Sequence, residues 1–374
     1  LDTDRGPGLH PDENNQAAVD TLTIYRSFRW GRHLDLVLTD TRSYRSPHPI
    51  PPALNRRLGG TDRYLSPLRA VEVFDAGAQY NDGAPPDVVT IGDTEVPNVR
   101  RDQPPGTMLG ARQKRWWKET VRRSDATWMV WGHSVPKLPM RLDLGSIDPN
   151  GETVVFTTDT WDGYLHEREE LMRFVEAHDV SNFVSLSGDN HNTFAGVVSP
   201  AYRHADSESA AASALGAEFS ICGVSSPSVF QALLQAVGPD SPLRPLITAD
   251  GRVTGGQEAS LNMTFQHGAR ASVTAANTGD AAQGLQAANP AHNSHLRYVD
   301  SRAQGIGIVT VTADGVETDM VTLPSPTDAR QAAGPTPLRT AQFRLAAREA
   351  GAPVELHGPA VSGELPFPLS ATQE

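Results

Sequence analysis

The sequence predicts an α/β fold, and three stretches carry the prediction. Residues 183–187 (Phe-Val-Ser-Leu-Ser) form an apolar run that ends at Gly188, and residues 127–131 (Thr-Trp-Met-Val-Trp) form another that ends at Gly132. Between them, residues 162–178 carry apolar side chains at helical spacing. Strand, helix and strand in this order are typical of a βαβ unit, so we expect the two strands to be neighbours that end at one edge of a sheet.

The residues that follow these two strands are the candidates for chemistry. Asp189 and His191 lie two positions apart, so an extended backbone would point both side chains to one face beyond the strand end. A carboxylate and an imidazole that converge there suit a hard or borderline metal ion, and the alternative is a simple turn with a surface aspartate and a partly buried histidine. His133 follows the other strand in the same way, at the sheet edge where ligands gather in open α/β folds. Taken by itself, His133 is better explained as a structural histidine than as a metal ligand.

Composition excludes several classes of protein. A chain of 374 residues is long enough for one large α/β domain or two ordinary ones. The formal charge of −12, with no basic run, argues against a nucleic-acid groove. No apolar stretch approaches the roughly 18 residues of a transmembrane helix, so no transmembrane segment is expected. Cys222 is the only cysteine, which rules out an intrachain disulfide, and its apolar surroundings predict a buried, inert thiol.

The chain is divided by composition into a lead-in, a main domain and a tail. Residues 1–20 read as an extended lead-in, residues 21–326 as the domain, and residues 327–374 as a proline-punctuated tail that wraps the domain. Residues 46–108 and 248–295 are expected to be long irregular insertions, and residues 138–160 to be irregular as well. The remaining elements that we predict are strands at 23–28, 34–39, 193–198 and 217–224, helices at 109–123 and 227–237, and a hairpin of 307–312 with 316–323.

A series of short motifs then links the chain to a known family. In order along the sequence they are Tyr25-Arg-Ser-Phe-Arg-Trp-Gly31, Leu38-Thr-Asp-Thr-Arg-Ser-Tyr-Arg45, Met108-Leu-Gly-Ala-Arg-Gln-Lys114, Trp128-Met-Val-Trp-Gly132, Trp161-Asp-Gly-Tyr164, Ser187-Gly-Asp-Asn-His191, Gly223-Val-Ser-Ser-Pro227, Pro242-Leu-Arg-Pro245 and the hairpin near Gly307. From about Tyr25 to Pro326 the chain resembles the carboxyl-terminal half of the alkaline phosphatase D family, within the calcineurin-like metallophosphoesterases and including phospholipase D-like members.

The resemblance implies a fold, a cofactor and a location. It implies a β-sandwich flanked by helices, with two divalent or trivalent metal ions (Fe, Mn, Zn or Ca) at the strand ends. The superfamily motif Gly-(His/Asp)-x-His falls on Gly188, Asp189 and His191, and His133 matches the place of a further ligand in purple acid phosphatases. Many members carry Asn or Gln at the position of His133, and an added imidazole favours transition metals over calcium. The family is secreted or periplasmic, although no signal peptide is visible in this chain.

One departure from the family leads to a hypothesis about a partner. The metal-binding motifs of the family's first half, including its bridging carboxylate, do not occur in residues 1–120, and the chain begins at Leu1. We therefore expect a product of proteolytic processing, a heterodimer in which an amino-terminal fragment of the same precursor completes the sheet and the site.

The activity that the resemblance implies is the hydrolysis of a phosphate ester by a hydroxide held between two metal ions. Arg42 is the candidate phosphate clamp, with an Asp40–Arg42 structural pair as the alternative. A phosphodiesterase or phospholipase D-like enzyme is our first interpretation, because the two insertions could shape a pocket for a diester, with lipid-derived esters among the substrates considered. An alkaline phosphomonoesterase and a non-catalytic subunit of a metallophosphatase-like complex are the alternatives.

Overall fold

The computed structural model describes residues 21–202, 213–249, 258–325 and 334–367; the predicted lead-in at residues 1–20 lies outside this part of the chain. Its central element, within those ranges, is a mixed seven-stranded sheet. In spatial order the strands are β1 (Arg26–Trp30), β2 (Leu34–Leu38), β6 (Trp128–Gly132), β9 (Phe183–Ser187), β11 (Gly216–Ser220), β10 (Thr193–Val198) and β12 (Leu296–Asp300).

The predicted βαβ unit is present at the middle of this sheet. β6 and β9 are parallel neighbours, and α5 (Leu165–Ala177) lies between them in sequence. β2 pairs in parallel with β6 on one side, and β11 pairs in parallel with β9 on the other. Four adjacent strands therefore end at the same edge.

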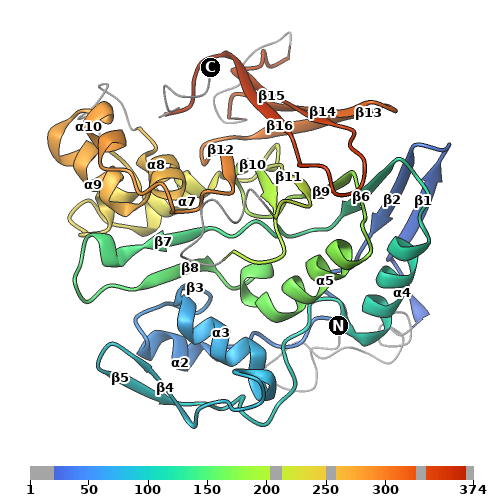
Figure 1. The fold of residues 1–374 in the computed structure, drawn as a ribbon. Helices are drawn as coiled ribbons and strands as arrows, with labels where there is room; N and C mark the ends of the chain where they lie inside the picture. The colour runs from blue at the N-terminus through green and yellow to red at the C-terminus, as the bar shows by residue number, and fades with distance from the viewer. Residues whose placement is uncertain (1–20, 203–212, 250–257, 326–333, 368–374) are drawn as a thin grey trace, which may run out of the picture.

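The two faces of the sheet are buried against different layers, as the alternation of side chains requires. Met129 and Trp131 pack against α5 and α4 (Gly110–Arg123), where Trp117 lies 4.5 Å from Trp131 between ring centroids. Trp128 and its alternate neighbours pack instead against a second sheet. The result is helices, sheet and sheet in three layers (Figure 1).

The second sheet corrects the prediction of a wrapping tail. Its strands are β13 (Gly305–Val311), β14 (Gly315–Thr322), β15 (Arg339–Ala346) and β16 (Leu356–Gly363). The hairpin of β13 and β14 was predicted, but β15 and β16 lie in the tail. Alternate residues of β15, among them Ala341 and Phe343, are buried against the large sheet, so the tail forms half of this layer of the core.

The segments predicted to be irregular contain regular elements. Residues 46–108 hold α2 (Pro52–Arg57), β3 (Tyr64–Pro67), α3 (Leu68–Ala76), the 3₁₀ turn η1 (Gly77–Gln79), β4 (Val88–Ile91) and β5 (Thr94–Pro97). Residues 138–160 hold β7 (Arg141–Asp143), η2 (Leu144–Ser146) and β8 (Thr153–Thr157), and β8 is the middle strand of a sheet of β3, β8 and β7.

The second insertion is helical rather than a set of long loops. Residues 248–295 contain α8 (Ser260–His267), α9 (Ala269–Thr278) and α10 (Ala281–Gln286). Residues 250–257 of this insertion lie outside the described part of the chain. The buried faces of α9 consist largely of alanine and serine, so the sequence shows little hydrophobic period. The other elements are α7 (Val229–Ala236), η3 (Trp161–Gly163) and η4 (Arg244–Leu246).

Two further expectations concern transmembrane helices and the Cys222 thiol. No helix in the described ranges has both the length and the apolar character needed to cross a membrane. Cys222 is buried, and burial raises the pKa of its thiol to about 11, so the predicted inert thiol is confirmed.

A buried carboxyl group fixes the start of α5. Asp75 of α3 accepts a hydrogen bond of 2.7 Å from the backbone N–H of His166 through Oδ2, while its Oδ1 is buried without a hydrogen-bond partner among the described residues. Burial raises the pKa of Asp75 to about 8, so the folded protein holds this group protonated at neutral pH.

The Asp75→Asn substitution is therefore expected to flatten the pH dependence of stability. Because the folded pKa lies above that of the unfolded chain, the stabilisation from Asp75 is complete below about pH 4 and is lost as pH rises to about 8. We expect the melting temperature of the unmodified protein to fall by a few degrees relative to Asp75→Asn across this window. Scanning calorimetry at several pH values tests this, with the exposed Asp125→Asn as control; parallel curves for Asp75→Asn and the parent would contradict it.

Candidate active site

The candidate residues lie where the parallel strands end. Backbone hydrogen bonds between neighbouring segments continue past the ends of the strands. The Thr39 N–H donates to the Gly132 carbonyl (3.1 Å), and the His133 N–H donates to the Leu186 carbonyl (3.0 Å). These bonds hold the segments after β2, β6 and β9 side by side. Arg42, His133 and Asp189 are thus brought to one edge of the sheet.

The turn after β2 presents Arg42 outward. The Asp40 carboxylate accepts hydrogen bonds from the backbone N–H groups of Arg42 and Ser43, each 2.9 Å long. The backbone of Asp40 is itself held by the side chain of Gln113 on α4 through bonds of 2.7 and 2.8 Å. Asp40 therefore shapes the turn, and the predicted structural pair between its carboxylate and the Arg42 guanidinium does not form.

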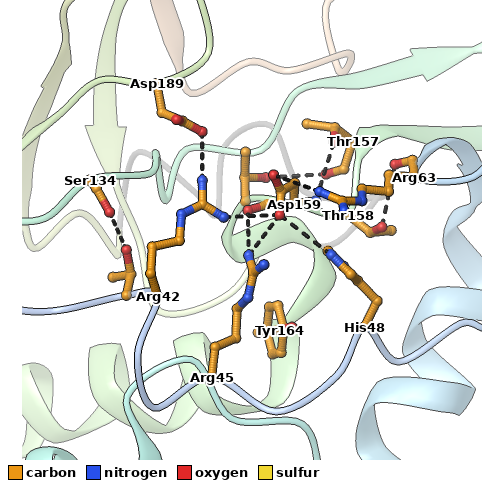
Figure 2. A network of polar contacts seen from close by, with 12 residues as sticks. Arg42, Arg45, His48, Arg63, Ser134, Thr157, Thr158, Asp159, Tyr164 and Asp189 are labelled. Atoms are coloured by element: carbon orange, nitrogen blue, oxygen red, sulfur yellow. Dashed lines mark hydrogen bonds and ion pairs between the residues drawn. The ribbon is translucent and has the colours of Figure 1, made fainter. Parts of the chain in front are cut away.

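Four basic side chains converge instead on Asp159 (Figure 2). Its Oδ1 lies 2.7 Å from Arg45 Nη1, 3.0 Å from Arg42 Nη1 and 3.5 Å from His48 Nε2, and its Oδ2 lies 3.4 Å from Arg63 Nη1. Burial raises the pKa of Asp159, but the hydrogen bond from Arg45 and the charge of Arg42 outweigh it, so the pKa lies below its usual value. Burial and the nearby Arg45 lower the pKa of His48, which is therefore neutral at pH 7.

Arg42 also connects this cluster to the predicted motif. Its Nη2 lies 2.9 Å from Asp189 Oδ2, so one guanidinium bridges Asp159 and Asp189. Both Arg42 and Asp189 are about two-fifths exposed, which leaves the pair accessible to a substrate. A planar cation at this position can bind a phosphoryl oxygen with two parallel hydrogen bonds.

The turn from Gly188 to His191 has an unusual backbone. Asp189 and His191 have φ angles of +70° and +55°, in the left-handed region that side-chain-bearing residues seldom adopt. Such conformations cost roughly 1–3 kcal/mol each and cluster at functional sites. The His191 carbonyl accepts a hydrogen bond of 2.7 Å from the Val229 N–H, which helps to hold the turn against the start of α7.

The ring of His191 is oriented by a backbone group. Nδ1 lies 2.8 Å from the Pro227 carbonyl, which fixes the tautomer with the proton on Nδ1. Nε2 then carries the lone pair. A histidine ligand of a metal ion is held in this way, with one nitrogen bonded to a carbonyl and the other directed at the metal.

His133 lies in a different environment, inside the protein. Its Nδ1 is 2.5 Å from the Val135 carbonyl, and its Nε2 is 2.6 Å from Ser185 Oγ and 2.7 Å from Lys137 Nζ. Burial and the charge of Lys137 lower the pKa of the ring well below its usual value, so the ring is neutral. The lone pair of Nε2 consequently faces the lysine ammonium.

Lys137 and Glu218 complete this buried cluster. Lys137 Nζ lies 3.7 Å from Glu218 Oε2 and 4.3 Å from the centre of the Trp131 ring. Burial lowers the pKa of Lys137 to about 8, although Glu218 opposes the shift. Glu218 Oε1 accepts hydrogen bonds from the Lys137 N–H (2.9 Å) and from Ser187 Oγ (2.7 Å), the residue that precedes Gly188.

Comparison with known proteins identifies the family. The sequence profile of the PhoD-like phosphatases matches residues 10–320, most of the chain. The chain belongs to the PhoD-like phosphatase family.

The relatives of this PhoD-like chain agree with the assignment. It is 24% identical over 198 residues to alkaline phosphatase D of Bacillus subtilis (strain 168), an alignment that covers 53% of this chain and 25% of the relative. It superimposes on a solved structure described as "Structure of PhoD" with a TM-score of 0.52 and 16% identity, over 93% of this chain and 45% of that one. The chain thus spans less than half the length of the relatives that it matches, and the structural likeness confirms the α/β fold.

PhoD-family phosphatases use metal ions, and the described residues fit part of such a site. Asp189 and His191 offer a carboxylate oxygen and an oriented imidazole nitrogen, which suit a borderline metal ion. In the described ranges, however, no group of three or more His, Cys, Asp or Glu side chains lies close enough to hold a metal ion. The structure therefore does not gather His133 with Asp189 and His191 into a ligand set, and the role of His133 as a ligand stays a prediction.

A large apolar pocket adjoins the turn. Its volume is about 710 Å³, and Asp159, Asp189 and His191 are among the residues that line it. One wall is a face of α7 that includes Val229 and Leu233, and the remaining walls come mainly from β3, β8 and the segment around η4.

Sequence reasoning missed Asp159, Arg45, His48 and Arg63. Arg42, Arg45 and His48 are spaced three apart after β2, a basic pattern that could have suggested a common anionic partner. Asp159 lies more than 100 residues further on, in a stretch predicted to be irregular, and no local pattern points to it.

Proposed function

We propose that this PhoD-like protein hydrolyses phosphate esters at the turn from Gly188 to His191, with phosphodiesters preferred over monoesters. The observation that carries the proposal is the Arg42 guanidinium, 2.9 Å from Asp189 and accessible at the ends of the parallel strands. A phosphoryl group at this turn would meet a cationic fork and the two predicted metal-binding side chains together.

In this proposal the residues of the chain have separate roles in hydrolysis. Asp189 and His191 would hold a metal ion, and bound metal ions supply the nucleophile at neutral pH and neutralise charge on the phosphoryl oxygens. Arg42 orients the phosphoryl group, and Asp159 with Arg45 fixes the position of the Arg42 side chain. Pro227 holds the His191 ring in the tautomer that leaves Nε2 unprotonated.

Local charge supports an anionic phosphate ester as the substrate. Arg42, Arg45 and Arg63 carry three positive charges, Asp159 and Asp189 carry two negative ones, and His48 is neutral. These side chains together carry one net positive charge, to which bound metal ions would add theirs, so the cluster suits a phosphoryl anion. The apolar pocket beside the turn is what favours a diester with an organic group. Lipid-derived diesters are among the substrates that this site chemistry admits, and hydrolysis of phosphomonoesters, as by an alkaline phosphomonoesterase, is the alternative.

We expect the rest of the ligand set to come from outside the described residues, and an exposed sheet edge is consistent with this. β1 is an edge strand of the large sheet whose residues are all exposed, and Trp30 is 79% exposed. Such an edge can pair with further polypeptide, which would complete the sheet. The comparisons do not support the predicted proteolytic processing and heterodimer. The likeness to alkaline phosphatase D agrees with the predicted secreted or periplasmic location without showing it directly. All of these stay predictions, as does a non-catalytic role in a larger complex.

The Arg42→Lys substitution tests the proposal. Lysine keeps the charge but loses the planar fork, so we expect kcat/KM for bis-p-nitrophenyl phosphate to fall by about 100-fold. The metal content should remain unchanged, because Arg42 is not a ligand. Arg173→Lys, on an exposed ion pair of α5, is the matched control. An unchanged kcat/KM in Arg42→Lys, or a higher kcat/KM for p-nitrophenyl phosphate in the parent protein, would count against the proposed clamp or the diester preference.

A further inference from the structure

The apolar pocket beside the candidate site has the character of a binding site for an organic group. Its walls are formed mainly by aliphatic and aromatic side chains, and its volume of about 710 Å³ lies within the range of small-molecule sites. The acidic side chains Asp159 and Asp189 line its polar end. A ligand held there would place one end at the Arg42 cluster and the other among apolar groups.

The helix α7 shows that this apolar surface is built into the fold. Val229, Ala232, Leu233 and Ala236 lie on one face of α7 at helical spacing, and all four line the pocket. The N-terminus of α7 is fixed by a capping box in which Ser228 and Gln231 bond to each other's backbone N–H. Since the Val229 N–H also bonds to the His191 carbonyl, the same helix end that anchors the catalytic turn begins the pocket wall.

A second observation that points to a binding function comes from the wall formed by β3 and β8. Leu65 of β3 lines the pocket with a φ angle of +56°, a conformation rare for a bulky side chain. Strained residues of this kind cluster at ligand-binding surfaces. Phe156 of β8 lies on the same side, so the pocket is enclosed by rigid strands and a capped helix rather than by loops alone.

We propose that this pocket binds the apolar organic group of the phosphate ester, so that the substrates are esters of hydrophobic alcohols, alkyl or aryl. The inference rests on the proposed function, because it assumes that the phosphoryl group sits at Arg42 and Asp189. Sugar phosphates and nucleotides are disfavoured, since aliphatic and aromatic side chains make up most of the lining and would leave many of their polar groups buried without hydrogen-bond partners. A short alkyl diester and a diacyl lipid share the required chemistry.

The test is a chain-length series. For methyl, butyl, hexyl and octyl p-nitrophenyl phosphates, kept below their micellar concentrations, kcat/KM is expected to rise about three- to fourfold per added methylene until the pocket is full. Binding of the matching alkylphosphonates, measured by calorimetry, should follow the same trend. A dihexanoyl glycerophospholipid forms a second arm as a competitor of the octyl ester: an inhibition constant below the KM of the octyl ester assigns the pocket to lipid substrates, and one above it assigns the pocket to single-chain esters.

Two variants of α7 make the test specific. Ala232→Trp fills the pocket from an exposed position, so the protein is expected to fold and to lose the dependence on chain length. Gln235→Trp, exposed on α7 but not lining the pocket, should retain it. Hydrolysis of all esters at equal rates, or an unchanged dependence in Ala232→Trp, would overturn the inference. If no ester is hydrolysed but phosphonate binding still rises with chain length, the proposed function fails and the pocket assignment stands; if binding is also flat, both fail.

Discussion

Replacing His191 with alanine is expected to lower kcat/KM for a phosphodiester by at least about 100-fold and to reduce bound metal in the same preparation. The ring is held by the Pro227 carbonyl with Nε2 carrying the lone pair, on the same turn as Asp189. Steady-state kinetics together with metal analysis by mass spectrometry measure both effects.

His178→Ala is the control for this substitution. His178 is exposed at the end of α5, where its ring stacks on Phe174 at 3.9 Å between centroids, and it precedes β9 whereas the turn follows it. Its loss should leave activity and metal content close to those of the parent. An His191→Ala protein that keeps its metal and its kcat/KM would show that the turn from Gly188 to His191 is not the reacting site.

The second large effect is expected in the buried cluster beneath the turn. Lys137→Met should destabilise the protein by about 3–5 kcal/mol, because it leaves the Glu218 carboxylate buried without its cation. Both side chains are almost completely buried, so water cannot replace the lost partner. Urea unfolding followed by fluorescence of the six tryptophans gives the free energy of unfolding.

A double-mutant cycle separates the pair from simple packing. Lys137→Met combined with Glu218→Gln removes both charges, so the double variant should be clearly more stable than the sum of the single losses predicts. Lys118→Met removes a partly exposed partner of Glu170, which keeps Lys114 as a second partner, and should cost no more than about 1 kcal/mol. Equal losses for Lys137→Met and Lys118→Met, or strict additivity in the cycle, would mean that the Lys137–Glu218 charge pair contributes little.

The parts of the fold that could be predicted are those in which local pattern and tertiary packing agree. The strands β6 and β9 are short apolar runs that end at glycine, and α5 has a clear helical period, so their order alone predicted the parallel pair. The alternating residues of β15 carry the same kind of signal. It was missed because prolines around it suggested a tail, although alternate side chains of this strand are buried.

The insertions were misread for a different reason. In α9 the buried positions are small, among them Ala271 and Ala275, so burial leaves almost no contrast in hydrophobicity along the sequence. What does mark these helices is glycine: Gly268 has a φ of +95° at the junction of α8 and α9, and Gly279 ends α9 in the left-handed conformation. Such junctions indicate helix ends even where the hydrophobic period is weak.

The site shows where strand order stops being informative. The strand order predicted that His133 and Asp189 share one edge, but it did not predict the ion pair of Arg42 with Asp189 at that edge. It could not reveal which way the His133 side chain turns, since that depends on the partners Lys137 and Ser185 in the interior. Long-range electrostatic contacts such as those of Asp159 are likewise set by the tertiary fold and leave no local pattern.

The inert thiol of Cys222 has a practical consequence. With its pKa raised to about 11, this thiol reacts poorly with maleimides near neutral pH, where the thiolate is the reactive form. A cysteine introduced at an exposed position of α7 or beside the turn would therefore take up a fluorophore or spin label selectively, without prior removal of a native cysteine. Distances between such labels would report how the pocket wall and the turn move when a phosphonate binds.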